Sequence, residues 1–233
     1  MKIYYDLHIH SILSPCGDEN MTPYNIANMA AIKGLNLIAV ADHNSSKNAQ
    51  AVIDAAKELP ITVIPAMEVQ TSEDVHILCY FKTCKDAEKF EKEIEANHSV
   101  KNRPDIFGRQ LIMDSEDGVL GEEERLLVYS CGLSVNGVLS LCEKCGGKCM
   151  PAHIDKNSFS IISNLGFIPP ECNFKAVELS KNATDDIRKQ FSEYSHFTSS
   201  DAHYLGDIAE PENFFISPSE NPGDIIDKFF SFL

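Results

Sequence analysis

An acid and two histidines alternate near the start of the chain, in the stretch YYDLHIHS. Because successive side chains of a β-strand point to opposite faces, Asp6, His8 and His10 would share one face of a strand. Burying these polar groups without partners would cost on the order of several kcal/mol. Imidazole and carboxylate groups are instead suitable ligands for a divalent metal ion. The alternative is a polar strand edge on which the two histidines are exposed by chance.

Other histidines and acids lie at or beside the ends of apolar, strand-like segments farther along the chain. Six of the eight histidines fall in such places, and only His98 and His196 do not clearly do so. In a barrel of parallel strands the active site forms at the C-terminal ends of the strands, where ligands distant in sequence converge. We therefore expect one metal centre built from these residues: His8, His10, His43, Glu68, His76, His153, Asp201 and His203.

The segments that would position these residues alternate between strand and helix patterns. Strand patterns occur at residues 2–10, 35–42, 61–69, 74–81, 148–154, 175–180 and 196–200, with an extra candidate at 214–216. Helix patterns occur at residues 22–33, 48–59, 86–96, 134–144, 158–165, 184–194 and 225–232. Strands that alternate with helices predict βαβ units, and this number of units predicts a closed or nearly closed barrel, with a doubly wound open sheet as the alternative.

The length of 233 residues fits one large domain, so we expect residues 1–233 to form a single α/β unit. Residues 97–124 lack a clear pattern and are expected to be an irregular or helical insertion. No apolar run reaches the roughly 20 residues needed to span a bilayer, and the first residues lack the apolar core of a signal peptide. We therefore expect a cytoplasmic protein that does not bind membranes.

The charge and the cysteine content restrict the partners. A net charge of −15 argues against a broad basic surface for nucleic acid, so nucleotides or short oligonucleotides are expected only as substrates. Eight cysteines in a chain of this size without an export signal favour free thiols over disulfides. The stretch CEKCGGKC spaces Cys142, Cys145 and Cys149 like ligands of zinc or an iron–sulfur cluster, with Cys172 as a candidate fourth ligand. The alternative is that these thiols are small buried hydrophobic groups.

The motifs DLHIHS, ADHN, AMEV, PAHID and SSDAH resemble, in the same order, those of the polymerase and histidinol phosphatase (PHP) superfamily. They extend from Asp6 to His203, which is most of the chain. The resemblance implies a distorted, TIM-like (β/α) barrel of seven parallel strands that holds two to three divalent ions of zinc, iron or manganese. It also implies three ligand groups: His8, His10, Glu68 and Asp201 for the first ion, Glu68, His76 and His153 for the second, and His43 and His203 for the third.

The third ion needs a further ligand. Members of the superfamily often place a histidine or aspartate six residues after the second histidine of the opening motif, and here that position is Cys16. A cysteine ligand favours zinc or iron over magnesium. Asp18 is the alternative ligand, and a Cys16 that binds no metal is a further alternative. Asp6 and Asp42 would support the ligating histidines from behind.

By this resemblance the chain would be a phosphoesterase, a hydrolase that cleaves a small phosphomonoester such as histidinol phosphate or a nucleotide-type phosphate. A hydroxide shared by two metal ions would attack phosphorus, and Asp201 and His203 would orient it or assist proton transfer. Arg103, Arg109 and Lys181 are candidates for binding the phosphate, with ordinary surface residues as the alternative. Two other functions stay open: an amidohydrolase-like enzyme that cleaves a C–N bond, and a non-catalytic, metal-binding regulatory domain.

Overall fold

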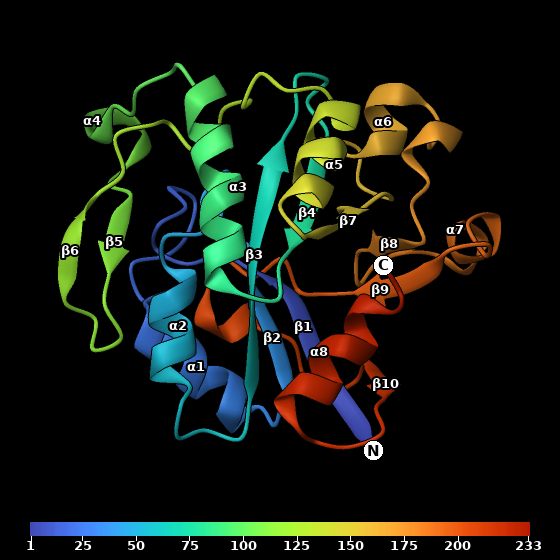
Figure 1. Cartoon of the computed structure of the whole chain (residues 1–233), viewed down its shortest axis with the longest axis horizontal. Helices are drawn as coiled ribbons and strands as arrows, with labels where there is room; N and C mark the ends of the chain where they lie inside the picture. Colours follow the sequence, from blue (N-terminus) through green and yellow to red (C-terminus); the bar gives the residue numbers. More distant parts are fainter.

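Three parallel strands lie at the centre of the fold, which the computed structural model describes for all 233 residues. They are β1 (Lys2–Ile9), β2 (Leu37–Val40) and β3 (Thr62–Gln70), and β2 pairs with both of the others. All four residues of β2 are buried, as expected for a strand that is covered on both faces. Helices α1 (Pro23–Ile32) and α2 (Ala49–Ala55) make the two crossover connections and pack beside each other on one side of these strands (Figure 1).

The other strands make the sheet mixed. Strand β4 (His76–Tyr80) is antiparallel to β3, and β7 (Lys148–Pro151) is antiparallel to β4. Strand β10 (Phe214–Ile216) is antiparallel to β1, which gives the order β10-β1-β2-β3-β4-β7. The prediction of seven parallel strands is therefore wrong. Only residues 71–75 separate β3 from β4, and because a parallel crossover needs a dozen or more residues, β4 has to run back along β3.

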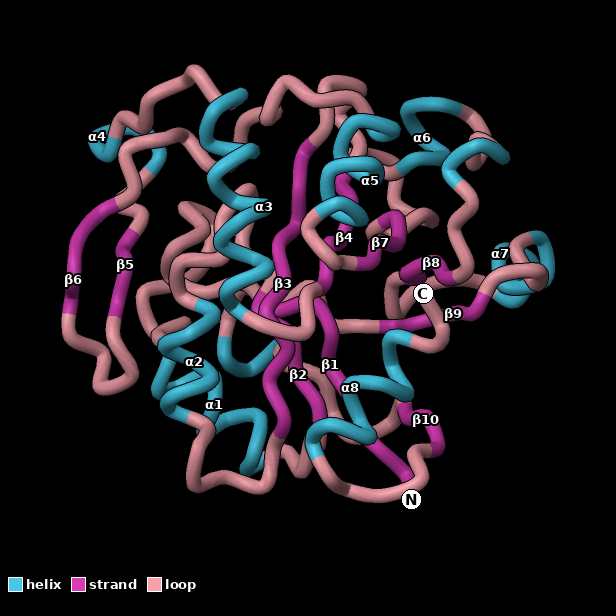
Figure 2. The backbone as a smooth tube through the Cα atoms, viewed as in Figure 1, coloured by secondary structure: helices cyan, strands magenta, loops and turns pink.

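Two further strands form a separate parallel pair: β8 (Ala176–Leu179) and β9 (Ser195–Thr198). Backbone hydrogen bonds connect this pair to the larger sheet on both sides. The Ile154 N–H, just after β7, donates to the carbonyl oxygen of Glu178 at 2.9 Å, and the His10 N–H, just after β1, donates to that of Ala202 at 2.9 Å. The sheet is thus curled like part of a barrel, as in the PHP and TIM-like expectation, with β8 and β9 between β7 and β1 (Figure 2).

One hydrophobic cluster takes residues from each of these strands, from Ile3 of β1 to Phe197 of β9. Helix α8 (Pro222–Phe230) closes this core near the amino-terminal ends of β1 to β3 (Figure 1). Its Phe229 is fully buried and meets Tyr80 and Phe197 edge to face, with ring centroids 5.0 and 5.5 Å apart. The carboxyl-terminal ends of the parallel strands are left for polar residues.

The remaining helices follow the sheet along its outer face and edge (Figure 1): α3 (Cys84–Asn97), α5 (Val135–Lys144), α6 (Ile161–Leu165) and α7 (Asp185–Gln190). Helices α3 and α5 pack on the β3–β4 side through a second core cluster that includes Phe81, Phe90 and Val138. Every helix is too short or too polar to cross a bilayer.

The expected insertion at residues 97–124 contains three short elements: α4 (Pro104–Phe107), β5 (Leu111–Met113) and β6 (Val119–Glu122). The two strands form an antiparallel hairpin at the left edge of Figure 1. The sequence does not reveal them because they are short and mostly exposed, so no hydrophobic alternation marks them. Asn48 docks the hairpin, since its side chain accepts from the Met113 N–H at 3.0 Å and donates to the Leu111 carbonyl oxygen at 3.1 Å.

A buried charge network ties the end of this insertion to helix α3. The Glu123 carboxylate lies 3.0 Å from Arg125 Nη2 and 2.5 Å from Lys47 Nζ, and Arg125 also reaches Glu91 of α3 at 3.3 Å. Burial alone would raise the pKa of Glu123. Hydrogen bonds from Arg125 and Lys47 outweigh burial and lower this pKa from 4.5 to about 2.

This network predicts an acid-dependent loss of stability. A carboxyl group whose pKa is lower in the folded than in the unfolded chain stabilises the fold above its unfolded pKa, and that contribution disappears as the pH falls through the folded pKa. We expect Glu123→Gln to lower the free energy of unfolding by roughly 1–3 kcal/mol at pH 7. The difference from wild type, measured by urea unfolding, should shrink as the pH falls from 4.5 to about 2, and a constant difference would contradict the assignment.

Candidate metal centre

The expected metal ligands gather at one place although they come from separate strands. Strand β1 carries His8, and His10 follows its last residue; β3 carries Glu68, and β4 begins at His76. The others follow the ends of strands: His43 after β2, His153 after β7, and Asp201 and His203 after β9. The structure therefore brings together all eight residues of the predicted centre, and the loop after β1 adds Cys16.

Glu68 is the common neighbour of five histidines. Its side chain is 1% exposed, and its two carboxylate oxygens lie 2.8–3.5 Å from ring nitrogens. Oxygen Oε1 faces His76 Nδ1 at 2.8 Å, His153 Nε2 at 3.1 Å and His8 Nε2 at 3.3 Å. Oxygen Oε2 faces His43 Nδ1 at 2.9 Å and His10 Nε2 at 3.5 Å. A carboxylate in this position can contact two cations at once.

Asp201 lies on the other side of the β1 histidines. Its Oδ1 atom is 3.2 Å from His10 Nε2 and 3.5 Å from His8 Nε2, and those two ring nitrogens are 3.1 Å apart. The second oxygen of Asp201 pairs with the ammonium group of Lys156. His8, His10 and Asp201 each offer one ligand atom within 4.8 Å of the others.

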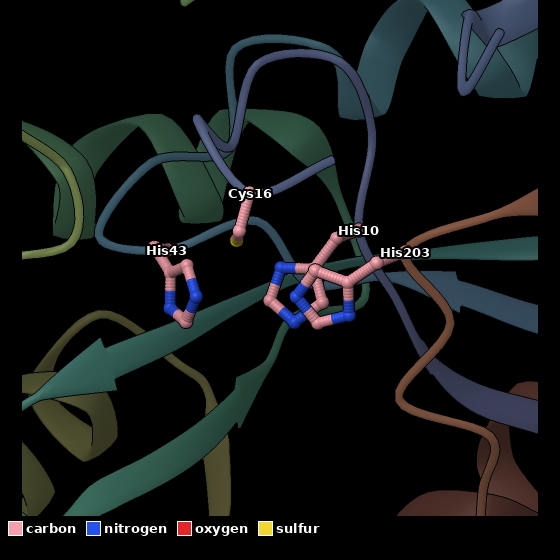
Figure 3. A group of neighbouring side chains, drawn as sticks. All are labelled: His10, Cys16, His43 and His203. Atoms are coloured by element: carbon pink, nitrogen blue, oxygen red, sulfur yellow. The ribbon is translucent and has the colours of Figure 1, made fainter. Parts of the chain in front are cut away.

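A third group contains His10, Cys16, His43 and His203, whose ligand atoms also lie within 4.8 Å of one another. Figure 3 shows the sulfur of Cys16 pointing toward the three rings. The loop that carries Cys16 turns so tightly that a Cβ on Gly17 would lie 2.4 Å from the Ser11 carbonyl oxygen, so glycine is required there.

Asp18, the alternative ligand, is outside this group. Its carboxylate accepts hydrogen bonds from the backbone and side-chain N–H groups of Asn20, at 3.0 and 2.8 Å. Between the two alternatives, the structure brings only Cys16 to the histidines: the residue is exposed but its sulfur points toward the rings (Figure 3), whereas the Asp18 carboxylate binds Asn20.

Glu178 orients two of the histidines, and sequence reasoning did not single it out as a site residue. Its carboxylate contacts His8 Nδ1 at 3.0 Å and accepts the His153 N–H at 2.9 Å. Ser14 Oγ similarly contacts His10 Nδ1 at 3.1 Å. Because Glu178 contacts Nδ1 of His8 and Ser14 contacts Nδ1 of His10, Nε2 is the nitrogen of each ring that faces the centre. The available signal for Glu178 is an acid in the middle of the apolar strand stretch KAVELS.

Asp6 and Asp42 are fully or almost fully buried, but they bind loops instead of ring nitrogens. Asp42 accepts hydrogen bonds from the Ser11 N–H, the Ser11 hydroxyl and the Ser14 hydroxyl, at 2.6–2.7 Å. Asp6 accepts from the N–H and hydroxyl of Ser200, at 3.0 and 2.6 Å. They support the centre indirectly: Asp42 through Ser14, and Asp6 by holding the segment that carries Asp201.

The charges of the centre favour a bound cation. Burial raises the pKa of Glu68, but the histidines around it lower this pKa well below its usual value. Burial lowers the pKa of His43, but Glu68 and Cys16 outweigh it and raise this pKa to about 10. The carboxylates raise the pKa of His8 in the same way. Without another cation the carboxylates thus draw protons onto His8 and His43, and a divalent ion could take the place of those protons.

The backbone around the centre is strained. Three non-glycine residues there have positive φ angles: Asn44 at 48°, His153 at 28° and Asp201 at 53°. Such conformations cost on the order of 1–3 kcal/mol each and persist where the surrounding structure imposes them. Asn44 is held by its side-chain N–H groups, which donate to the carbonyl oxygens of Leu127 and Tyr129 at 2.7 and 2.9 Å.

The donor set fits divalent metal ions of the zinc, iron or manganese class. Ring nitrogens, carboxylate oxygens and one sulfur converge there, with the ligand atoms of each group within 4.8 Å of one another. His8 Nε2 and His10 Nε2 face each other at 3.1 Å, and two protonated nitrogens could not do so without repulsion. His153 Nδ1 is buried and has no hydrogen-bond partner, so this ring presents only Nε2 to Glu68 and the centre.

A cavity of about 260 Å³ opens onto the centre. Its walls include Glu68, His203, Lys156 and Phe159. Lys156 is the only lysine or arginine among the lining residues, and it follows the PAHID motif directly. Phe159 stacks on the ring of His76 with centroids 4.8 Å apart and is 42% exposed, so it gives the cavity one aromatic wall.

The three predicted phosphate-binding residues lie elsewhere. Arg103 pairs with Asp105 at 2.8 Å and Arg109 with Glu122 at 2.6 Å, and both guanidinium groups are largely exposed on the insertion. Lys181 borders a different hollow, near Ser200 and Ala209. None of the three lines the cavity at the centre.

A family model described as PHP domain matches residues 6–205. The fold is similar to that of the lesion-specific endonuclease Q from Pyrococcus furiosus, with a TM-score of 0.69 and 19% identity over 97% of this chain. The chain spans only 55% of that endonuclease. No curated protein sequence matches the chain.

Two other solved structures share the fold. One is an amidohydrolase from Chromobacterium violaceum with bound sulfate, with a TM-score of 0.60 and 18% identity, covering 98% of this chain and 96% of that one. The other is a two-domain protein from Bacteroides vulgatus that contains a predicted PHP-like metal-dependent phosphoesterase. Its TM-score is 0.61 and its identity 14%, covering 97% of this chain and 62% of that one.

Proposed function

Because the chain belongs to the PHP domain family, we propose that it is a metal-dependent phosphoesterase that cleaves a small phosphomonoester at the cavity beside Glu68. The observation that carries this proposal is one buried carboxylate surrounded by five histidines, with a cation on the wall of the adjoining cavity. Histidinol phosphate and nucleotide-type phosphates are the substrate classes to consider first.

We assign two to three divalent ions to the three groups of ligand atoms. His8, His10 and Asp201 would hold the first ion with Glu68, and Glu68 would also bind a second ion with His76 and His153. His43, His203 and Cys16 would hold a third, with His10 beside it. When bound, the ions would neutralise charge on the phosphoryl oxygens and lower the pKa of a water molecule.

His203 could move a proton only where no third ion occupies its Nε2 atom. Its Nδ1 atom lies 2.9 Å from the Asp201 carbonyl oxygen, which can only accept, so the proton resides on Nδ1. Nε2 then carries a lone pair that can bind a metal ion or accept a proton. Burial lowers the pKa of His203, but Cys16 and Asp201 outweigh this effect and raise it.

Lys156 would bind the substrate phosphate in place of the arginines expected from sequence. Its ammonium group pairs with Asp201, yet the side chain is 41% exposed and can turn toward a ligand in the cavity. A charge-assisted hydrogen bond contributes roughly 1.5–3 kcal/mol.

This role predicts a change in substrate binding. We expect Lys156→Ala to raise KM for a phosphomonoester about tenfold or more, because that range of free energy corresponds to at least about a tenfold change in affinity. Lys156→Arg should recover part of the loss because it keeps the charge. Lys57→Ala, at an exposed site outside the cavity, is the control. An unchanged KM in Lys156→Ala would exclude the role.

The proposed activity is tested by purifying the protein without oxygen, measuring its metal content, and assaying it on a substrate panel. The panel contains phosphomonoesters, nucleotides, DNA with lesions and cyclic amides. Hydrolysis of phosphomonoesters that is lost after chelation and restored by metal supports the proposal. Absence of turnover with every metal and substrate would favour a non-catalytic, metal-binding domain.

Two kinds of substrate in the panel, DNA with lesions and cyclic amides, test the two alternative activities. Similarity to a lesion-specific endonuclease favours a nucleic-acid substrate. The net charge of −15 argues against one, because nucleic acid is itself negatively charged. Similarity to an amidohydrolase favours C–N cleavage. Turnover of lesion-bearing DNA alone, or of a cyclic amide alone, would replace the phosphomonoester proposal.

A further inference from the structure

Three thiols lie close together in the core, near the end of β4 that is opposite His76. Cys79 lies in β4, Cys142 in α5 and Cys149 in β7, and their sulfur atoms are all within 4.8 Å of one another. Cys79 and Cys149 are directly opposite in the antiparallel pair, with sulfur atoms 3.5 Å apart. None of the three takes part in the candidate metal centre.

This grouping differs from the one that the stretch CEKCGGKC indicates. Cys145 ends helix α5 and is not among the three clustered thiols. Cys172, the candidate fourth ligand, donates instead to the side chain of Asn136 at 3.5 Å. Cys79 takes their place, and it lies more than sixty positions before the other two cysteines.

The spacing of the sulfur atoms matches that of a metal–thiolate site. A metal–sulfur distance of about 2.3 Å places the sulfur ligands of one ion about 3.8 Å apart in a tetrahedron and about 4.0 Å apart in a trigonal plane. The observed separations, from 3.5 Å to at most 4.8 Å, include both values. Packing of three small hydrophobic groups would not require this convergence.

The cluster is tightly packed on one side and open on the other. A Cβ on Gly147 would lie 2.5 Å from the Cys142 sulfur, so only glycine lets the backbone pass this close to the thiol. On the other side, Cys149 lines a cavity of about 410 Å³. Two lysines, Lys148 and Lys175, and two acids, Glu143 and Glu171, also line it. The cavity provides a path for an ion and room for a water molecule beside the cluster.

We propose that Cys79, Cys142 and Cys149 form a separate structural site for one thiophilic divalent ion of the zinc class, with water from the cavity as a fourth ligand. Binding converts three thiols into thiolates and releases three protons to solvent. Three thiolates and a divalent ion carry a net charge of −1. The ion would join α5 to β4 and β7, the strands that lead to His76 and His153.

Cadmium binding tests this site, since cadmium–thiolate bonds absorb in the ultraviolet and bonds to nitrogen or oxygen do not. The experiment uses the full chain with Cys16→Ser, which removes the only cysteine near the histidines. We expect cadmium to produce the absorption of three thiolates per ion, and zinc to displace it. Absence of this absorption in the Cys16→Ser protein would overturn the proposal.

Two further variants locate the site. Cys142→Ala and Cys149→Ala should each lose the absorption and one equivalent of bound metal, whereas Cys84→Ala, at a thiol outside the cluster, should keep both. Cys149 is only partly buried, so its replacement tests the site even if Cys142→Ala does not fold. Retention of the absorption in folded Cys149→Ala would refute the assignment. So would a Cys79–Cys149 disulfide that forms in place of metal binding, seen as a mass decrease of two hydrogens.

The test of the thiol site is independent of the test of phosphoesterase activity. Cys149→Ala should remove the metal from the thiol site and leave kcat on a phosphomonoester unchanged. No thiol of the cluster lines the cavity beside Glu68. Failure of the thiol site would therefore leave the function untouched, and failure of the function would leave the cadmium result intact.

Discussion

Glu68→Gln is expected to remove metal from two sites together and to lower kcat by at least about 10²–10³-fold. Glutamine keeps the shape of the side chain but loses the negative charge that faces five histidines. Metal content measured by mass spectrometry should fall by about two ions per chain, because Glu68 would be shared by the first and second ions.

The control for this experiment is Glu58→Gln, which neutralises an exposed glutamate far from the cavity. It should keep full metal content and activity. Circular dichroism should show that the Glu68→Gln protein is folded. A folded Glu68→Gln protein with the metal content of wild type would show that Glu68 does not bridge two ions.

Glu178→Gln is expected to weaken metal binding about 10–100-fold, which is typical of removing a carboxylate that orients a ligating histidine. Glu178 holds His8 Nδ1 at 3.0 Å, and glutamine retains an oxygen that can still accept the His153 N–H. The affinity is measured by competition with a chelator.

The effect on turnover separates orientation from direct participation. Saturating metal should restore most of the kcat of Glu178→Gln, because the residue acts through His8 and does not contact the cavity. Glu193→Gln, at an exposed acid just before β9, is the matched control. A kcat that stays low at saturating metal would mean that Glu178 takes part in the reaction itself.

The thiol site, if present, would place a second metal on the same pair of strands. Strand β4 begins at His76 and contains Cys79, and β7 contains Cys149 four residues before His153. Metal analyses of the wild-type chain should therefore be read together with Cys149→Ala, so that ions at the thiols are not counted among those at Glu68.

Local patterns in the sequence determined which residues meet at the centre. Alternation in YYDLHIHS predicts that His8 and His10 point the same way at the end of the first strand, and acids or histidines at the ends of other apolar runs mark further strand ends. Because the carboxyl ends of neighbouring parallel strands meet at one rim, these residues could be assigned to a common site without coordinates. Membership of the PHP domain family agrees with that assignment, and the role of each residue as a ligand stays a prediction.

Only the tertiary structure decided which residues from other segments contact the centre and which thiols meet in the core. Glu178 reaches His8 across 170 positions of sequence, Lys156 reaches Asp201 across 45, and Cys79 reaches Cys149 across 70. Such contacts depend on strand order and register, which no local pattern specifies. Arg103 and Arg109 instead pair with acids beside them in the insertion, because an exposed guanidinium group takes the nearest carboxylate. The sequence by itself thus specified the candidate ligands at the strand ends, and packing specified which lysine, which orienting carboxylate and which thiols lie together.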